Sequence, residues 1–403
     1  MLDLTKPVDL GSAGFAENKY AWYEEIREKS PVQLVKISVV RMYAVSRYED
    51  CEAVLKDPRV LRNRATATGG GGRAPFPIPP SLKPMVQSMI VEDDPNHRRL
   101  RELVRRAFRP QAIAQLESNI EAFSHELLDR LAERKTFDLQ SEYALQIPTR
   151  MIADMMGIPH KAMPEFRERM NVLTNGFSGW RVLKSLFWDL RGTVSFVRQL
   201  VDDKRRSPAD DILSALIQAE DDGDQLTDDE IVAMVFLLIV AGFETTVHLI
   251  TNGVHTLLAH PEALQQLRDE PTLMDSAVEE ILRHRGPVHG TKPGYASEDI
   301  ELHGTVIPRG KPIMPLLGAA NHDPRVFDAP QTFDITRSPN RHLSFGHGVH
   351  FCLGAHLARA ETRIGRANLL ERFPNLRLAD PDGVKVVSMP AWHRLDGLEV
   401  AVS

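Results

Sequence analysis

The chain has 403 residues, of which 42% are hydrophobic and 26% are charged, and its formal net charge is −6 at pH 7. This length and composition predict a globular protein with a sizeable core, and the negative charge argues against a nucleic-acid-binding protein. With two cysteines, no disulfide framework is indicated. The N-terminus lacks a signal-peptide core, and the longest apolar run, residues 231–242, is too short to span a bilayer. We therefore expect a cytoplasmic, monomeric protein without a membrane span.

Most segments have the periodicity of amphipathic helices. Residues 31–37, 40–45, 300–306 and 313–317 instead have the composition of short β-strands. Glycine- and proline-rich residues 69–84 predict a long loop, and such loops in compact domains are usually functional. Because no linker or internal repeat divides the chain, we expect a mainly α-helical fold with small β-sheets, formed by a single domain over residues 1–403.

The clearest helix begins at Thr227, which together with Glu230 has the spacing of a capping box. It can continue to Ala259, because Pro261 should end it. Its first half is apolar on nearly every side, which predicts a long helix through the centre of the fold.

Midway along this helix lies the sequence Ala-Gly-Phe-Glu-Thr, residues 241–245. A glycine inside a helix costs about 1 kcal/mol relative to alanine, and a carboxylate in an apolar stretch needs a partner or water. One interpretation is a helix crossing at Gly242 with Glu244 facing solvent.

Residues 345–354, Phe-Gly-His-Gly-Val-His-Phe-Cys-Leu-Gly, carry the strongest functional signal. Cys352 precedes a helical stretch that begins at Ala355. A thiolate there would receive the positive end of the helix dipole, which favours the charged form of a nucleophile or metal ligand. A lone cysteine is more often a small buried apolar residue. A phosphate-binding turn or the nucleophile of a Cys–His hydrolase would also place these residue types close together.

This loop resembles the haem-ligand loop of the cytochrome P-450 family, Phe-x-x-Gly-x-x-x-Cys-x-Gly, in its bacterial form. The resemblance implies haem b as the cofactor, O2 as the co-substrate and Cys352 as the axial iron ligand. It also implies the long central helix over the haem that this fold contains. The remaining loop residues assigned to the haem site are Phe345, Gly346, His350 and Gly354.

Residues 241–245 resemble the family's Ala-Gly-x-Asp/Glu-Thr motif for oxygen activation. The resemblance implies that Gly242 lets the helix open near the iron. It implies that Glu244 and Thr245 deliver protons. With Cys352 present, this interpretation is favoured over a simple helix crossing.

Two further motifs of the family concern the support of the loop and the haem. Glu280 and Arg283 resemble its Glu-x-x-Arg pair, and Arg337 lies in a segment that resembles the source of the second arginine of a structural triad. His97 and Arg101 resemble its His-x-x-x-Arg motif, assigned to a haem propionate, where charge-assisted hydrogen bonds are strong. His350 would serve the opposite side of the haem.

One position departs from the family pattern. The family usually places an arginine two residues before Ala296, where this chain has Gly294. The resemblance assigns that arginine to a haem propionate. Either Lys292 replaces it, with poorer bidentate geometry than a guanidinium, or the propionate is held differently in this chain. Upstream, Asp94 followed by Pro95 predicts a helix start with Asp94 as its cap.

The resemblance implies a pocket with mainly apolar walls, which narrows the substrate only to lipophilic small molecules. The predicted lining residues are Ile78, Met85, Met89, Phe177, Leu237, Val240, Ala241, Val288 and His289.

The predicted function is a haem-thiolate monooxygenase that hydroxylates or epoxidises its substrate. The chain has no Rossmann fingerprint and no cysteine cluster, so electrons from NAD(P)H should arrive through a ferredoxin or flavodoxin and a separate reductase. Arg98, Arg105 and Arg109 form the expected docking surface for that acidic carrier. Two different functions would use the same haem site. One is a peroxide-driven peroxygenase, which generally lacks the acid–alcohol pair, and the second is a haem sensor or electron carrier without turnover.

Overall fold

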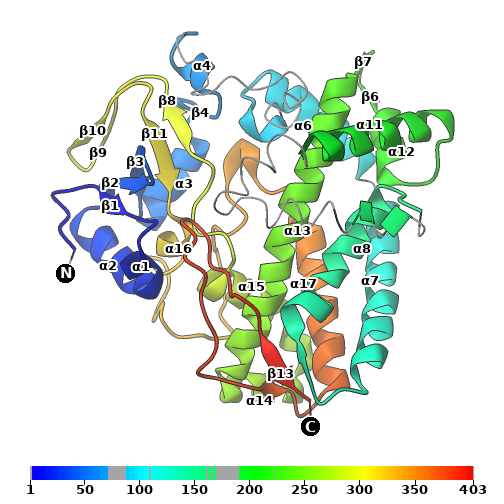
Figure 1. The fold of residues 1–403 in the computed structure, drawn as a ribbon. Helices are drawn as coiled ribbons and strands as arrows, with labels where there is room; N and C mark the ends of the chain where they lie inside the picture. Colours follow the sequence, from blue (N-terminus) through cyan, green and yellow to red (C-terminus); the bar gives the residue numbers. More distant parts are fainter. Residues whose placement is uncertain are drawn as a thin grey trace. The chain divides into compact units, whose positions relative to one another are not determined.

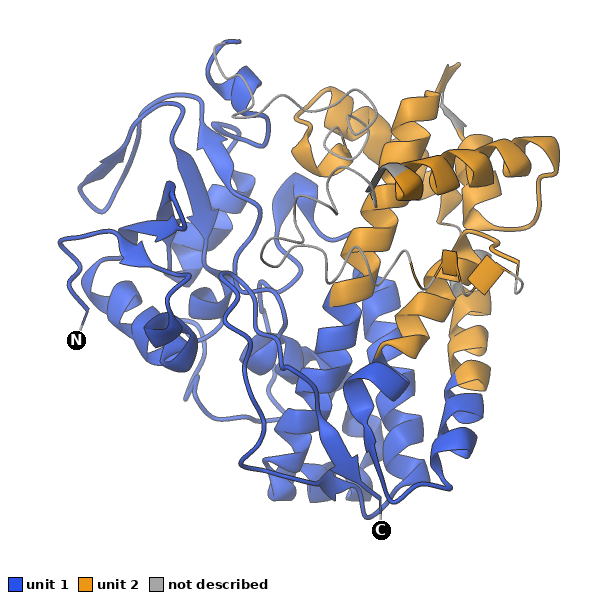
Figure 2. Cartoon of the chain, viewed as in Figure 1, with its two compact units in different colours: residues 1–73, 124–144, 245–403 blue, residues 74–123, 145–244 orange. Residues whose placement is uncertain are grey.

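The computed structural model describes residues 2–70, 88–108, 110–159, 162, 163, 165, 166, 168, 190–221 and 223–402. The chain divides into two compact units (Figure 2). Unit 1 comprises Met1–Arg73, Ser124–Ala144 and Thr245–Ser403, and unit 2 comprises Ala74–Phe123 and Leu145–Glu244. The expectation of one domain over residues 1–403 stays a prediction.

Unit 1 contains a six-stranded sheet with the order β1-β2-β3-β11-β8-β4. β2 and β3 form an antiparallel hairpin, in which Val32 lies opposite Val45. β11 pairs parallel with β3 and antiparallel with β8, and β4 forms an edge beside β8. The strands are β1 Val8–Asp9, β2 Val32–Ile37, β3 Val40–Val45, β4 Val60–Leu61, β8 Gly294–Ala296 and β11 Pro312–Pro315.

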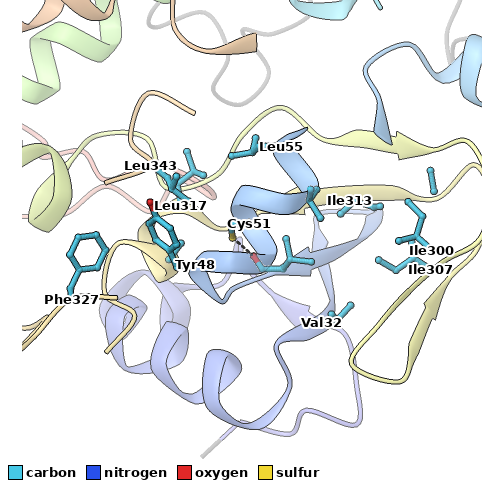
Figure 3. Close-up of a cluster of buried hydrophobic side chains, with 14 residues drawn as sticks. Val32, Tyr48, Cys51, Leu55, Ile300, Ile307, Ile313, Leu317, Phe327 and Leu343 are labelled. Carbon is cyan, nitrogen blue, oxygen red and sulfur yellow. Dashed lines mark hydrogen bonds between the residues drawn. The ribbon is translucent and has the colours of Figure 1, made fainter. Parts of the chain in front are cut away.

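Helix α3 (Tyr48–Lys56) packs its apolar side chains against this sheet (Figure 3). Tyr48, Cys51 and Leu55 recur every three or four residues, which places them on one face of the helix. They join a buried cluster that includes Val32 and Ile313 from the strands. The sheet is therefore held to α3 by a continuous apolar core.

The rest of unit 1 is mainly helical, with two small sheets. α15 packs against α17, and α16 packs against α2 and α3. The helices are α1 Ala13–Glu17, α2 Lys19–Lys29, α4 Arg64–Ala67, η3 Gln140–Ala144, α14 Pro261–Asp269, η6 Pro271–Leu273, α15 Met274–Arg285, α16 Leu317–Ala320, η7 Gly348–His350 and α17 Ala355–Arg372. The small sheets contain β9 Ile300–Leu302 with β10 Thr305–Ile307, and β12 Arg377–Leu378, β13 Glu399–Ala401 and β5 Thr136–Asp138.

Unit 2 consists of helices and one short hairpin among its described residues. α12 packs against both α6 and α11. The elements are η2 Met89–Val91, α6 Asn96–Ala107, α8 Gln146–Met155, α11 Leu190–Arg206, α12 Ile212–Ile217, β6 Glu220–Asp221 and β7 Asp224–Gln225.

Two helices, labelled in Figure 1, run from unit 2 into unit 1 (Figure 2): α7 (Pro110–Leu131) and α13 (Asp228–Leu258). The capping box predicted for α13 is confirmed. The Thr227 N–H donates to the Glu230 carboxylate at 2.8 Å, and the Glu230 N–H donates to Thr227 Oγ1 at 3.3 Å.

The apolar run at residues 231–242 was predicted to be too short to span a bilayer. The whole of α13 is nevertheless long and apolar enough to cross a membrane, since its most apolar window has a mean hydropathy of 2.0. Of that window, 61% is buried within the protein, and the core helix of a globular protein passes the same test.

Candidate functional site

The cysteine loop ends at the N-terminus of α17 and is shaped by glycines. The Cys352 N–H donates to the Phe345 carbonyl at 2.9 Å, which closes the loop. Gly346 and Gly348 have φ angles of +72° and +70°, in the left-handed region that favours glycine. A Cβ atom at Gly348 would lie 2.6 Å from the carbonyl oxygen of Leu55. The loop is therefore seated against the end of α3, where position 348 admits no side chain.

Cys352 is exposed. Its neighbours Val349 and Phe351 are apolar side chains with exposed fractions of 56% and 40%. A Cβ atom built on Gly346 or Gly354 would meet no atom within 4 Å, so the surface beside the thiol is open. An open apolar surface next to a thiol at a helix N-terminus indicates a ligand-binding surface.

The structure brings Glu280, Arg283 and Arg337 together in unit 1. Arg283 makes a bidentate contact with Glu280, at 2.8 and 2.7 Å, and both side chains are fully buried. Arg337 Nε donates to the same carboxylate at 3.2 Å. The N–H of Asp334 and the amide of Asn340 also donate to it, at 2.9 and 3.1 Å. These bonds satisfy a carboxylate that would be costly to bury alone.

Asn321 connects this network to the cysteine loop. Its backbone carbonyl accepts a hydrogen bond from Arg283, and its side-chain oxygen accepts one from the N–H of Leu343 at 2.8 Å. Its amide group donates to Ser344 Oγ at 2.9 Å, and that hydroxyl donates to the Leu282 carbonyl at 2.6 Å. The segment immediately before Phe345 is thus tied to α15.

A second contact under the loop was not predicted from the sequence. Arg359 on α17 donates twice to Glu279, at 2.6 and 2.8 Å, and its guanidinium lies over the Phe345 ring, 4.5 Å from the centroid. His342 Nε2 lies 3.1 Å from the Glu279 carboxylate. Burial would raise the pKa of Glu279, but the bonds from Arg359 and His342 outweigh it and lower the pKa to about 2. The sequence carries no local signal for this contact, because Glu279 and Arg359 lie 80 positions apart.

The middle of α13 contains an exposed apolar stretch, although the turns before it are largely buried. Val240, Ala241 and Gly242 are exposed, with 49% of Val240 accessible, whereas Phe243 is buried. Glu244 and Thr245 follow and are half-buried. The predicted proton-transfer residues therefore come directly after an exposed apolar stretch.

His97 and Arg101 lie one turn apart on α6. His97 is 2% exposed, and its Nδ1 is 3.6 Å from an Asp94 carboxylate oxygen. Burial lowers the pKa of His97, and the Arg101 charge lowers it further. The predicted capping role of Asp94 is wrong: α6 starts at Asn96 without a side-chain cap, because the Asp94 carboxylate instead accepts a hydrogen bond from Arg98 at 2.9 Å.

The predicted pocket residues are distributed over both units. Leu237 is half-buried on α13, and Met89 is buried in η2. Val288 is half-buried beside the apolar core of unit 1. His289 is buried, and its ring stacks on that of His393 at 5.5 Å. Outside the described residues lie Ile78, Met85, Phe177 and Arg109.

Of the predicted docking residues, Arg98 and Arg105 are exposed on α6, with 82% and 71% of their side chains accessible. Each forms an ion pair within its own segment, Arg98 with Asp94 and Arg105 with Glu102.

The residues present fit a haem bound through a cysteine. Cys51 is excluded as the ligand, since it is buried and its thiol donates to the Val45 carbonyl at 3.2 Å. Burial also raises the pKa of Cys51 well above its usual value. Cys352 has the opposite surroundings, with an open surface for a flat ligand beside the sulfur. The assignment of Cys352 to the haem iron, and of His97, Arg101 and His350 to the haem propionates, stays a prediction.

Comparison with known proteins gives matches to one family. A cytochrome P-450 family model matches residues 149–382. Cytochrome P-450 107B1 of Saccharopolyspora erythraea is 39% identical over 380 residues, covering 92% of each chain. The structure of the bacillaene polyketide synthase cytochrome P-450 PksS of Bacillus subtilis aligns with a TM-score of 0.90 and 35% identity, covering 98% of this chain and 99% of that one. A myxobacterial cytochrome P-450 in complex with myristic acid also aligns with a TM-score of 0.90 and 35% identity, covering 98% of each.

These matches confirm the predicted fold, a mainly helical chain with small sheets and a long helix α13. They also confirm the predicted haem-thiolate cofactor and the use of O2. With a family model that matches more than half of the chain, and a relative 39% identical over 92% of it, this chain belongs to the cytochrome P-450 family of haem monooxygenases.

Proposed function

We propose that this monooxygenase inserts one atom of O2 into a C–H or C=C bond of a lipophilic small molecule. The observation that carries the proposal is the exposed Cys352 at the start of α17, in a chain whose long helix exposes an apolar stretch before an acid–alcohol pair. The bound haem supplies the redox chemistry, in which two electrons and two protons per O2 place one oxygen atom in the product and the second in water.

The apolar stretch of α13 supports a lipophilic substrate. Val240, Ala241 and Gly242 are exposed, and Leu237 lies one turn earlier and is half-buried. These side chains offer contact area and no charge, as most ligand sites do. The relative solved in complex with myristic acid binds a compound of this class.

Glu244 and Thr245 would supply the two protons. The Glu244 carboxyl would pass protons inward from solvent, and the Thr245 Oγ1 would present them on the face of α13 where O2 reacts. Gly242 would let the helix widen there, because it has no side chain and its nearest non-local neighbour beyond the helix is Ile152, 3.7 Å from a built Cβ.

The electrons would come from NADH or NADPH through a ferredoxin or flavodoxin and its reductase. Residues 96–107 of α6 contain five arginines and one glutamate, an unusual density of positive charge in a chain of net charge −6. Such a surface steers an acidic partner toward it. We propose that the protein receives these electrons as a monomer in the cytoplasm.

The defining experiment supplies ferredoxin, reductase and NADPH. It measures together the NADPH oxidised, the O2 consumed and the product formed. Compounds are first selected by the shift they induce in the haem absorption spectrum. A selected compound should consume one NADPH and one O2 per product molecule. Product formed equally well from H2O2 without reductant would identify a peroxygenase. Reduction without any O2-dependent product would identify an electron carrier or a sensor.

A further inference from the structure

The edge of the large sheet brings an arginine opposite Gly294. β4 and β8 pair antiparallel, with Val60 opposite Ala296 and Leu61 opposite Tyr295. Continuing this register places Arg62 opposite Gly294. Residues directly opposite in an antiparallel pair point to the same face, as do residues two apart along one strand. The side chains of Val60 and Arg62 therefore leave the sheet on the face toward which a side chain at 294 would point.

Gly294 has no room for that side chain. A Cβ atom built on it would lie 2.4 Å from Cγ1 of Val60, and the next atom, the Leu61 carbonyl oxygen, is 3.4 Å away. An arginine at position 294, where the family pattern places one, would therefore require Val60 on β4 to shift. The same contact confirms that Val60 shares the face of Gly294.

Arg62 is fixed in place by reciprocal hydrogen bonds with Lys292. Its Nη1 donates to the Lys292 carbonyl, two residues before Gly294, and Lys292 Nζ donates to the Arg62 carbonyl at 3.0 Å. Both side chains are half-buried. Asn63, the next residue, caps α4 by accepting the Ala65 N–H at 2.9 Å. The Lys292 ammonium is thus engaged in holding the Arg62 backbone, which argues against its predicted role as the replacement for the arginine.

We propose that Arg62 binds a haem propionate in this chain, from the strand next to the one that carries the arginine in the family pattern. A guanidinium matches a carboxylate with two parallel N–H donors. It has five donors in one plane, so the bond to the Lys292 carbonyl orients that plane. The proposal rests on the proposed role of Cys352 as the haem ligand.

The test measures how fast the haem leaves the protein for an excess of apomyoglobin, followed by absorption. Arg62→Gln should accelerate haem loss about tenfold, the usual weight of one charge-assisted contact. The rate of haem loss from Arg62→Lys should lie between the rates of this variant and the wild type. Lysine keeps the positive charge but lacks the two parallel N–H donors of the guanidinium. Arg64→Gln, at an exposed position on α4, is the matched control and should leave the rate unchanged.

A second arm replaces the haem by its dimethyl ester, whose propionates carry no charge. If Arg62 contacts a propionate, Arg62→Gln should no longer change the rate of loss of the ester. Equal acceleration for haem and ester would show a purely structural role and overturn the proposal, as would an unchanged rate for both. Should Arg62→Gln not fold, the Arg62→Lys variant gives the same comparison.

The absorption band of the reduced, CO-bound protein reports on the thiolate separately. A wild-type protein without the thiolate band would contradict the assignment of Cys352. A normal band with a rate of haem loss insensitive to Arg62 would contradict the role of Arg62 alone.

Discussion

Cys51 and Cys352 carry the same thiol in opposite surroundings. Cys51 lies in the apolar core beneath the sheet, where burial raises its pKa and keeps the sulfur protonated (Figure 3). Cys352 is exposed between an open loop surface and the N-terminus of an 18-residue helix. A helix N-terminus favours the thiolate, which is the form that ligates iron.

Cys352→Ala should therefore abolish the strongly red-shifted band of the reduced, CO-bound protein. Cys51→Ala should keep the band, with some loss of thermal stability from the small cavity it creates. Absorption spectra of the two purified variants are the measurement. A band that survives in Cys352→Ala, or disappears in Cys51→Ala alone, would contradict the assignment.

Thr245→Ala should uncouple the reaction. Substrate affinity should stay nearly unchanged, since an apolar stretch of α13 precedes the hydroxyl, while more H2O2 and less product form per NADPH. Glu244→Ala should slow turnover about 10- to 100-fold, near the lower end of proton-transfer contributions. Thr256→Ala is the matched control, because its hydroxyl donates to the Asn252 carbonyl on the same helix. Wild-type coupling in Thr245→Ala would refute the role.

At the scale of elements, local signals were readable from the sequence and long-range pairings were not. The start of α13 was predicted because the Thr227–Glu230 capping box is contained within four residues. The strands β2 and β3 were predicted from the composition of residues 31–37 and 40–45, whereas their pairing as a hairpin was not. β5 and β13 were missed because each has three residues and their pairing joins Phe137 to Val400 across most of the chain.

The same limit applied to the site. Motifs located Cys352 and the Glu280–Arg283 pair, since their spacing lies within one loop or one helix turn. The bond between Glu279 and Arg359 joins two helices 80 positions apart, and no local pattern announces it. The proposed propionate contact moves from position 294 on β8 to Arg62 beside β4. That move follows from the pairing of the two strands, and a single sequence does not show which residues pair.

The network around Glu280 should decide whether the cysteine loop keeps its shape. Glu280→Gln leaves two arginines facing a neutral amide in a buried site, so it should lower the free energy of unfolding by about 3–5 kcal/mol, as other broken buried pairs do. It should also increase the fraction of protein without haem. Glu262→Gln, an exposed glutamate on α14, is the control. Urea unfolding and the haem-to-protein absorbance ratio measure both effects, and a change below about 1 kcal/mol would contradict the supporting role.

The charge of α6 makes a separate prediction for electron transfer. Arg98→Glu with Arg105→Glu should slow reduction by ferredoxin, and high salt should slow the wild type in the same direction. Arg130→Glu is the matched control, since Arg130 on α7 is also exposed and paired with a glutamate one turn away. Stopped-flow reduction rates at low and high salt are the measurement. Equal rates for all three proteins would place the docking surface elsewhere.

At the scale of the whole molecule, unit 1 buries a cluster of histidines that must remain neutral. Burial is the first cause that lowers the pKa of each, to about 3 for His322 and well below the usual value for His289 and His393. The rings contact one another and Tyr20, and the cationic groups Lys19, Arg283 and Arg285 further disfavour protonation. The cluster comprises His284, His289, His322 and His393.

The stability of the protein should therefore fall as the pH drops below 6.5, the ordinary pKa of these groups. Unfolded histidines then take up protons that the folded cluster cannot accept, at a cost of up to about 1.4 kcal/mol per pH unit for each. Buried Glu361 opposes this trend, because burial raises its pKa to about 8 and its protonated form is favoured in the folded state. Four histidines outweigh one glutamate, so the net loss should remain.

Urea midpoints between about pH 7.5 and about pH 5.5 test this. His284→Asn should reduce the slope with pH, whereas the exposed His356→Gln should not change it. A midpoint that is constant over this range would contradict the prediction.

The chain passes back and forth between the two units, and this limits where segments of two related proteins can be joined in one chimera. Neither unit is one continuous stretch, and an exchange of unit 2 with a related protein has its last boundary between Glu244 and Thr245. A chimera cut there would take the acid of the proton-transfer pair from one parent and the alcohol from the second. Hybrids that move this junction a few turns toward Leu258 keep the pair from a single parent, and they should retain coupled turnover more often than hybrids cut at the boundary itself.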